Sequence, residues 1–401
     1  MEFEEIHCAL LRRARLPIPP SYMPLTPLDG PFSDLAFAIG AAELGVEGDW
    51  ARIFDLNLSR IVKFLQEVPI SSPGLVGGVA GLNCMVSAAA DLFDKSLMEL
   101  MPIMYEKVIS DSEKKIDSVR KGENLRIADY DYVEGLVGIG YHLDILKDTL
   151  DSMLEVDRKQ TEREIVDSLT SHILKFKSEA FYIHGENIPE HYVRVDLKPC
   201  SLLDFGFAHG ILGVYWYLSR KLHIDPRVNE ALTVLELQMA EIFQRGPNRE
   251  FSPFLLRQGN DFNFAPVGVN GWCYGHPGMA LADSSRGRLR ARMFPRTGEP
   301  FSFDLDSGLG ICHGLSGQLL VWDSLRLPLP EQPRKFHRGK VESVVSDLDS
   351  LFDFMSPALN ENFGFWNGVL GGLLATLQLE RSLETRSIIS PLKLFGLGVY
   401  A

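Results

Sequence analysis

The sequence predicts an all-α protein, an α/α toroid in which inner and outer helices form a double barrel. A unit Gly-x-x-Gly recurs six times along the 401 residues, and most copies lead into an apolar stretch. Six copies of this kind favour a repeat architecture over a chance motif. The units are Gly78–Gly81, Gly135–Gly138, Gly210–Gly213, Gly275–Gly278, Gly314–Gly317 and Gly368–Gly371.

Each unit has the character of a helix start. Glycine allows a tight turn and a close approach of two backbones, and a helix that is apolar nearly all round is buried. The stretches Val214–Leu218 and Leu373–Leu377 are apolar, whereas residues 157–178 are amphipathic and charged. We therefore expect one inner and one outer helix per repeat, with the glycine turns gathered at one end of the barrel. The best strand signals are Phe181–His184 and Tyr192–Val195.

The composition is that of a globular protein. Hydrophobic residues make up 45% of the chain, and 40 basic against 53 acidic residues give a net charge of −13. This profile excludes collagen, coiled coils and bulk disorder. The acidic balance argues against a nucleic-acid partner, which would require a basic face.

The sequence predicts neither a secretory signal nor a transmembrane segment. Residues 1–5 are acidic and lack an apolar run. The longest uncharged stretch, Val68–Ala90, is interrupted by prolines and glycines, so only Leu82–Ala90 is expected as a buried helix. Five cysteines form an odd, sparse set that does not indicate a disulfide framework. We expect a cytoplasmic protein with reduced thiols.

Two cysteines and a histidine adjoin the glycine units. Cys273 stands two residues before Gly275, and Cys312 and His313 directly precede Gly314. Two thiolates and one imidazole leave a tetrahedral position open, as catalytic zinc sites require, and thiolates select zinc over magnesium or calcium. The sequence therefore predicts a zinc site at these three residues. The other cysteines are expected to be structural: Cys8, Cys84 and Cys200.

Three further residues near the turns have more than one interpretation. His209 holds the same place in its repeat as His313, directly before the glycine, and fits a fourth ligand, an acid/base group or a helix cap. Asp131 fits an acid/base group, a residue that orients a histidine, or an acid favoured by the helix dipole. His276 is a possible alternative metal ligand.

A basic cluster stands out in this acidic chain. It is either a solvated face or a contact for an acidic segment of a peptide. Its members are Arg286, Arg288, Arg290, Arg292 and Arg296.

These motifs together resemble the lanthionine synthetase C-like family, the cyclases of class I lanthipeptide biosynthesis. The resemblance extends from about residue 74 to 377. It is carried by Trp272–Gly278, Ile311–Gly314, Ala208–Gly210 and Asp131–Gly135.

The resemblance implies an α/α toroid that uses Zn²⁺ to add peptide cysteine thiols to dehydroalanine or dehydrobutyrine, forming lanthionine or methyllanthionine thioether rings. It implies zinc ligands at Cys273, Cys312 and His313, and catalytic roles for His209, Asp131 and Tyr274, with Tyr274 beside the metal. The implied partners are a dehydrated precursor peptide, together with a dehydratase and an exporter in a biosynthetic complex. Such a complex would place the protein peripherally at the membrane.

The sequence departs from the family in two places. Family members commonly carry an arginine four residues before the motif cysteine, where this chain has Val269. The apolar run Met279–Ala282 is also brief, so the inner helix there should be short or irregular. Some family members carry a small strand-containing insertion that resembles a peptide-binding module, and residues 152–203 are the expected place for it within the toroid domain of residues 1–401.

Other functions remain open on the sequence alone. A non-catalytic toroid would bind a precursor peptide or a partner enzyme and use zinc structurally; the missing arginine motivates this alternative. A eukaryotic-type relative would add glutathione to dehydro residues, although the tyrosine of Trp272–Gly275 favours the bacterial cyclases. A thiol-alkylating toroid of the prenyltransferase kind usually has an Asp, Cys and His set, which this chain lacks.

Overall fold

The protein is described here from a computed structural model. It covers residues 3–15, 30–68, 72–149, 152–192, 201–246, 252–259, 261–265, 270–289, 301–345, 364–366, 368–382 and 390–397. The chain forms two compact units: Met1–Glu106 with Phe303–Val399, and Lys107–Ser302 with Tyr400–Ala401.

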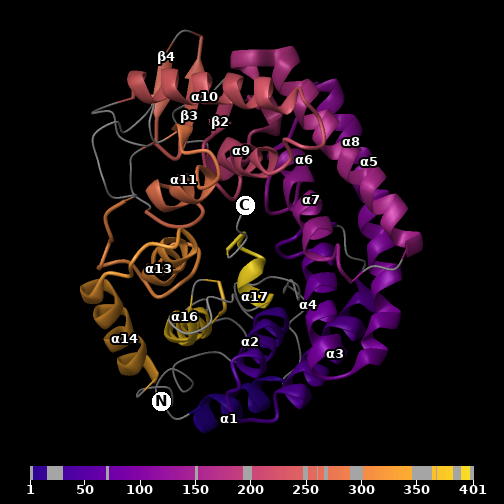
Figure 1. Cartoon of the computed structure of the whole chain (residues 1–401), viewed down its shortest axis with the longest axis vertical. Coiled ribbons are helices and arrows are strands. Elements are labelled where there is room, and N and C mark those ends of the chain that lie inside the picture. The colour runs from indigo at the N-terminus through magenta and orange to yellow at the C-terminus, as the bar shows by residue number, and fades with distance from the viewer. Residues whose placement is uncertain are drawn as a thin grey trace. The chain divides into compact units, whose positions relative to one another are not determined.

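Apolar helices form the centre of the first unit. Its elements are α1 (Phe3–Arg13), α2 (Pro31–Glu43), α3 (Trp50–Glu67), α4 (Val79–Leu92), η1 (Lys95–Leu100), the start of α5 (Met101–Lys121), α13 (Leu315–Ser324), α14 (Glu331–Val345), α16 (Val369–Ser382) and α17 (Ser390–Lys393). Helix α2 packs against α3, α4, α16 and α17, and Figure 1 shows α2, α16 and α17 side by side. Helix α3 is amphipathic and buries Ile53, Phe54, Asn57 and Ile61 at helical spacing.

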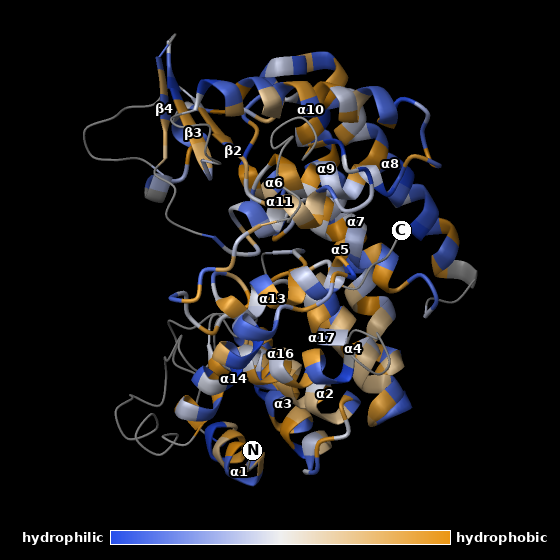
Figure 2. Cartoon of the chain, turned by 60° about the vertical axis from the view of Figure 1, so that its left-hand side comes forward, coloured by the Kyte–Doolittle hydropathy of each residue, from blue (hydrophilic) through white to orange (hydrophobic). Residues whose placement is uncertain are grey.

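The second unit repeats this plan. It holds the rest of α5, then α6 (Ile127–Tyr130), α7 (Leu136–Ile145), α8 (Ser152–Phe176), η2 (Lys177–Glu179), η3 (Gly185–Asn187), η4 (Glu190–Tyr192), α9 (Ile211–Ser219), α10 (Val228–Arg245) and α11 (His276–Ala282). All nine residues of α9 are buried, and α9 contacts α7, α8, α10 and α11. Hydrophilic residues recur along α8 and α10, which cover α9 (Figure 2).

A small antiparallel sheet belongs to the second unit. Its strands are β1 (Ile183–His184), β2 (Ser201–Asp204), β3 (Phe254–Gln258) and β4 (Asp261–Phe264), in the order β1-β2-β3-β4. Leu202 of β2 faces Leu256 of β3, and Figure 1 shows β2, β3 and β4 beside one another. The predicted strand at 181–184 is confirmed for Ile183–His184. The other prediction is wrong at Tyr192, which ends the 3-10 turn η4, and Val193–Val195 lie outside the described residues.

Residues 152–203, the expected place of an insertion, divide between a helix and the sheet. The first half is α8, which packs against α7, α9 and α10. Only β1 and β2 fall in the second half or at its end, while β3 and β4 follow more than 50 residues later. Strand β2 ends at Asp204 and leads directly into the turn before α9.

The glycine units begin the inner helices as predicted. Helices α4, α7, α9, α11 and α13 each have the first glycine of a unit as N-cap, and α16 begins directly after Gly368. At the described starts of the first five, the N-cap glycine has no side chain that could cap the helix. The preceding loop folds back instead, so that Gly81 N–H donates to Gly74 O (3.3 Å) and Gly138 N–H to Asp131 O (3.2 Å). These bonds satisfy donors that a helix start leaves without intrahelical partners.

Close backbone packing explains the second glycine of the unit. A Cβ added to Gly81 would lie 2.0 Å from Leu75 O, and one added to Gly317 would lie 1.8 Å from Ile311 O. Any side chain would therefore force the loop away from the helix. The predicted short inner helix is also confirmed, because α11 has only seven residues.

One inner helix, α2, was not predicted. It begins after Gly30, which has a φ of +82°, but Ser33 stands where the second glycine of a unit would be. Ser33 Oγ accepts a hydrogen bond from Phe365 N–H (2.6 Å). The apolar run Phe32–Ala42, with Asp34 as its one charged residue, was the signal for this helix. Among the described helices, none is long and apolar enough to cross a membrane.

Candidate functional site

The residue before the first glycine of a unit carries the chemistry of the turns. In the part of the chain that the structure describes, four turns have a polar side chain there: Glu134, His209, Tyr274 and His313. Three residues before the glycine, by contrast, stand the buried rings of Tyr132, Phe207 and Trp272. These rings contact one another, with centroids of Tyr132 and Phe207 5.2 Å apart and of Phe207 and Trp272 5.3 Å apart. In the turns before α7, α9 and α11, a buried ring thus stands two residues before the polar side chain.

Backbone hydrogen bonds join neighbouring turns of the second unit. Tyr132 N–H donates to Ala208 O (3.0 Å), and Phe207 N–H donates to Cys273 O (2.7 Å). The turns before α7, α9 and α11 therefore form a bonded series. In the first unit, Cys312 N–H donates in the same way to Trp366 O (3.1 Å). The main chain at both cysteines is thus held in place before any ligand binds.

Asp131 and His209 form a hydrogen-bonded pair in the second unit. His209 Nδ1 lies 2.8 Å from Asp131 Oδ2. Asp131 is buried, and its Oδ1 accepts from the backbone N–H groups of Glu134 (2.8 Å) and Gly135 (2.7 Å). A carboxylate only accepts hydrogen bonds, so the shared proton sits on Nδ1 of His209. The His209 side chain is 38% exposed, which leaves it reachable from solvent.

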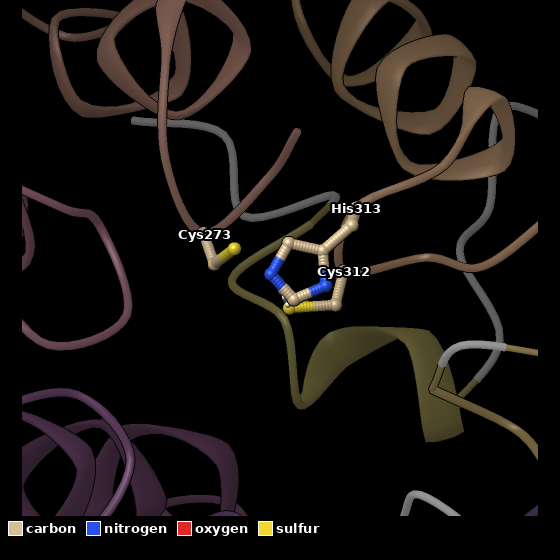
Figure 3. A group of neighbouring side chains, drawn as sticks. All are labelled: Cys273, Cys312 and His313. Atoms are coloured by element: carbon tan, nitrogen blue, oxygen red, sulfur yellow. Dashed lines mark hydrogen bonds between the residues drawn. The ribbon is translucent and has the colours of Figure 1, made fainter. Parts of the chain in front are cut away.

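The two cysteines and His313 come from two of these turns. Cys273 is buried in the turn before α11, while Cys312, also buried, precedes the exposed His313 before α13. Cys312 Sγ lies 3.8 Å from His313 Nε2. Figure 3 draws the three side chains, and one ligand atom from each lies within 4.8 Å of the other two. His276 does not belong to this group.

Tyr274 takes part in a second buried network. Its hydroxyl donates to Asp204 Oδ2 (2.8 Å), and the Tyr192 hydroxyl donates to the same oxygen (2.7 Å). Asp204 Oδ1 accepts from Gly206 N–H (2.6 Å). Asp204 and Tyr192 were not singled out from the sequence. The signal for Asp204 was a lone charge after the apolar Leu202 and Leu203, five residues before His209.

Burial dominates the electrostatics of these turns. It raises the pKa of the Asp204 carboxyl, although His209 and the donated hydrogen bonds oppose the shift. It also raises the pKa of Tyr274 far above the usual range, helped by the charge of Asp204. The pKa of Glu134 is raised by burial and by Asp131, against the influence of Lys115. Asp204, Glu134 and Tyr274 thus retain their protons better than they would in water.

Comparison with known proteins places the chain in a family. The model of the family described as lanthionine synthetase C-like protein matches residues 37–391. The chain belongs to this family. It is 23% identical over 355 residues to the nisin biosynthesis protein NisC of Lactococcus lactis subsp. lactis, covering 82% of this chain and 79% of the relative. A solved structure of nisin cyclase superposes with a TM-score of 0.66 at 21% identity, covering 98% of this chain and 96% of the other.

The comparison confirms the predicted fold class and the predicted family. This lanthionine synthetase C-like chain has the α/α toroid fold of nisin cyclase, with helices predominating and strands confined to a small sheet.

The structure describes only some of the basic cluster and of the cysteines outside the proposed zinc site. Arg286, the first arginine of the basic cluster, is not part of a solvated face, because it pairs with buried Glu236 (3.3 Å). Arg290, Arg292 and Arg296 lie outside the described residues, as do Cys200 and Val269. Cys8 is exposed on α1, and Cys84 is buried in α4.

Proposed function

We propose that this protein is a zinc-dependent cyclase that forms lanthionine or methyllanthionine rings in a dehydrated precursor peptide. The reaction adds a cysteine thiol across the double bond of a dehydroalanine or dehydrobutyrine. The S–H bond breaks, a C–S bond forms at the β-carbon, and a proton is delivered to the α-carbon. The observation that carries the proposal is the convergence of Cys273, Cys312 and His313 ligand atoms within 4.8 Å.

The donor set fits zinc. Two sulfurs bound at about 2.3 Å in tetrahedral geometry stand about 3.8 Å apart, which is compatible with a group whose ligand atoms all lie within 4.8 Å of one another. We propose Cys273, Cys312 and His313 as the three ligands. Zinc held there leaves one position for a substrate thiol and lowers the pKa of that thiol, so that it can react as a thiolate. A closed structural site would instead need a fourth protein ligand, which the group described around Cys273 does not contain.

The Asp131–His209 pair supplies the proton chemistry. Adding a thiolate to the double bond generates an enolate that must be protonated at the α-carbon. Asp131 fixes the His209 tautomer with the proton on Nδ1, so that Nε2 can carry the exchanging proton. The exposure of His209 allows a peptide to approach it, whereas Asp131 is buried. We propose His209 as the general acid and Asp131 as the residue that orients it.

Tyr274 has a different role in this proposal. Its raised pKa keeps the hydroxyl protonated, so it can donate a hydrogen bond but is a poor proton donor. We assign the proton transfer to His209 because its side chain is exposed and is hydrogen-bonded to Asp131, and we expect Tyr274 to orient groups beside Cys273. The remaining expected partners, a dehydratase and an exporter that handle the same precursor, belong to this proposal too.

Incubation with a dehydrated precursor peptide tests the function directly. Ring closure leaves the peptide mass unchanged but removes free thiols, so alkylation followed by mass spectrometry counts the rings formed. We expect thiols to disappear only with metal-loaded protein. Unchanged thiols with the loaded protein would favour the non-catalytic scaffold, and addition of free glutathione to the peptide would favour the glutathione-transferring alternative.

A further inference from the structure

Asp204 is a buried carboxylate, and both of its oxygens accept hydrogen bonds from groups of the protein. Its side chain has no solvent exposure. Oδ1 accepts from Gly206 N–H (2.6 Å), and Oδ2 accepts from the hydroxyls of Tyr274 (2.8 Å) and Tyr192 (2.7 Å). A substrate therefore cannot reach the carboxylate. Asp204 can therefore influence a reaction only through the groups that donate hydrogen bonds to it.

Tyr274 is held from a second side as well. A Cβ added to Gly206 would lie 2.5 Å from Cε1 of the Tyr274 ring, and one added to Gly210 would lie 2.4 Å from Asp204 Oδ1. The ring and the carboxylate fit because both positions are glycine. The hydroxyl is fixed by a hydrogen bond and the ring by close packing, which together define one orientation of the side chain.

The same segment also fixes the neighbouring cysteine. Residues 204–210 follow β2 and carry His209, and within them Phe207 N–H donates to Cys273 O (2.7 Å). One short segment therefore holds the Tyr274 side chain, the Cys273 main chain and the His209 imidazole.

We propose that Asp204 is a positioning residue for the cyclisation reaction, which it serves by holding the side chain of Tyr274, the residue that follows Cys273. The inference rests on the proposed function. Tyr192 reinforces the arrangement, because its hydroxyl lies 2.9 Å from that of Tyr274 and shares the same carboxylate oxygen. Strand β2 thereby connects the small sheet to the turn that bears Cys273.

A double-mutant cycle tests this role. In Asp204→Asn the amide oxygen can still accept from Gly206 N–H, but the amide nitrogen replaces the oxygen to which both hydroxyls donate. The Tyr274 hydroxyl must then turn. A misplaced group near the reacting atoms costs about 10²-fold in rate, so we expect a kcat loss of that order with KM little changed. Tyr274→Phe should lose a similar factor, and the double variant should be no slower than the slower single one.

A matched control separates positioning from stability. Tyr215 donates to buried Glu236 (3.1 Å), which is another tyrosine–carboxylate bond in the same unit but lies away from the turns. Tyr215→Phe should lower the melting temperature about as much as Asp204→Asn while keeping the cyclisation rate. Zinc content should stay at the wild-type level in all of these variants. Proton NMR gives a substrate-free measurement: a hydroxyl resonance lost in Tyr274→Phe should also be lost in Asp204→Asn and retained in Tyr215→Phe.

The outcomes distinguish this inference from the proposed function. A wild-type protein that fails to cyclise the precursor overturns the function itself. A cyclising wild type with full-rate Asp204→Asn, or with losses that multiply in the double variant, overturns only the role of Asp204. If Asp204→Asn does not fold, Gly206→Ala also tests whether the orientation of Tyr274 matters, because its Cβ would contact the Tyr274 ring. Its rate loss should vanish in a Tyr274→Ala background, and a persistent loss contradicts the inference.

Discussion

At the scale of single residues, the site depends on groups that are distant in sequence. Asp131 and His209 are 78 positions apart and form a 2.8 Å hydrogen bond. The sequence could name both residues, because each stands at a glycine turn, but it left several roles open for each. The geometry reduces the number of roles open to Asp131. Its carboxylate accepts hydrogen bonds from backbone N–H groups of its own turn, and it also orients the histidine. Asp204 escaped prediction because it precedes the glycine unit and makes its contacts through a tyrosine far along the chain.

Removing the His209 imidazole should separate proton transfer from metal binding. We expect His209→Ala to keep one zinc per chain and to lose about 10²–10⁴-fold in cyclisation rate, the range for a general acid or base. Asp131→Asn should behave alike, since an amide opposite Nδ1 favours the wrong tautomer. Metal analysis and thiol-alkylation kinetics measure the two effects. Loss of zinc in His209→Ala would make His209 a ligand, and a full rate would assign the proton to another group.

Removing either thiol should abolish stoichiometric zinc. Cys273→Ala or Cys312→Ala deletes one of only three proposed protein ligands, so atomic emission should find far less than one zinc per chain. Cys84→Ala is the matched control, because Cys84 is equally buried but lies in α4 outside the ligand group. It should retain the metal. Stoichiometric zinc in the Cys273, Cys312 double variant would rule out the assignment.

At the scale of elements, the glycine units predicted six of the inner helices, whereas α2 does not begin at such a unit. Six inner helices begin at a Gly-x-x-Gly unit because their loops pack backbone against backbone. This close packing requires glycine at fixed positions, and the glycines can be recognised in the sequence. Ser33 breaks the pattern at α2, where a serine hydroxyl bonded to Phe365 N–H stands in place of the second glycine. The sheet was only partly predicted, since β1 has two residues and β2 pairs with β3 about 50 residues away. Such non-local pairing leaves little local signal.

Two glycine substitutions in the first unit should have opposite effects on stability. Gly81→Ala places a Cβ 2.0 Å from Leu75 O, so the loop before α4 must shift, at a cost of about 1–3 kcal/mol. Gly339→Ala lies on the exposed face of α14 with no atom within 4 Å of the new Cβ. It should stabilise the protein by about 0.5–1 kcal/mol through helix propensity. Urea unfolding midpoints measure both, and equal effects would contradict the backbone-packing explanation of the repeat.

At the scale of the whole molecule, buried neutral histidines make folding sensitive to acid. Burial lowers the pKa of His142 to about 3, and those of His172 and His337 to about 4. Each stays neutral in the folded protein at pH values where the unfolded chain binds a proton. Asp34 has the opposite effect, because burial raises its pKa to about 6 despite its ion pair with Arg13. The histidines outnumber it, so these four groups together should destabilise the fold as the pH falls from 6.5 towards 4.

His172 allows this dependence to be tested at one position. Its Nδ1 donates to Val119 O (2.9 Å) and its Nε2 accepts from Phe181 N–H (3.3 Å), so it joins α5, α8 and the segment after η2 as a neutral ring. Burial is the main cause of its lowered pKa, with Lys175 adding to the effect and the Val119 bond opposing it. Because the folded pKa lies below the unfolded value of about 6.5, the stability from this group is complete above pH 6.5 and is lost as the pH falls towards 4. The loss is about 3 kcal/mol in total.

The variant His172→Asn keeps a donor for Val119 O but cannot titrate. We expect it to be less stable than the wild type at pH 7.5, because the Phe181 N–H loses its acceptor. The difference in unfolding free energy should shrink as the pH is lowered to 4.5. Only the wild type has a residue at this position whose protonation favours the unfolded chain in that range. Denaturant unfolding at several pH values measures the difference. Parallel stability curves for the two proteins between pH 7.5 and 4.5 would show that His172 titrates normally in the folded state and is not the neutral link described here.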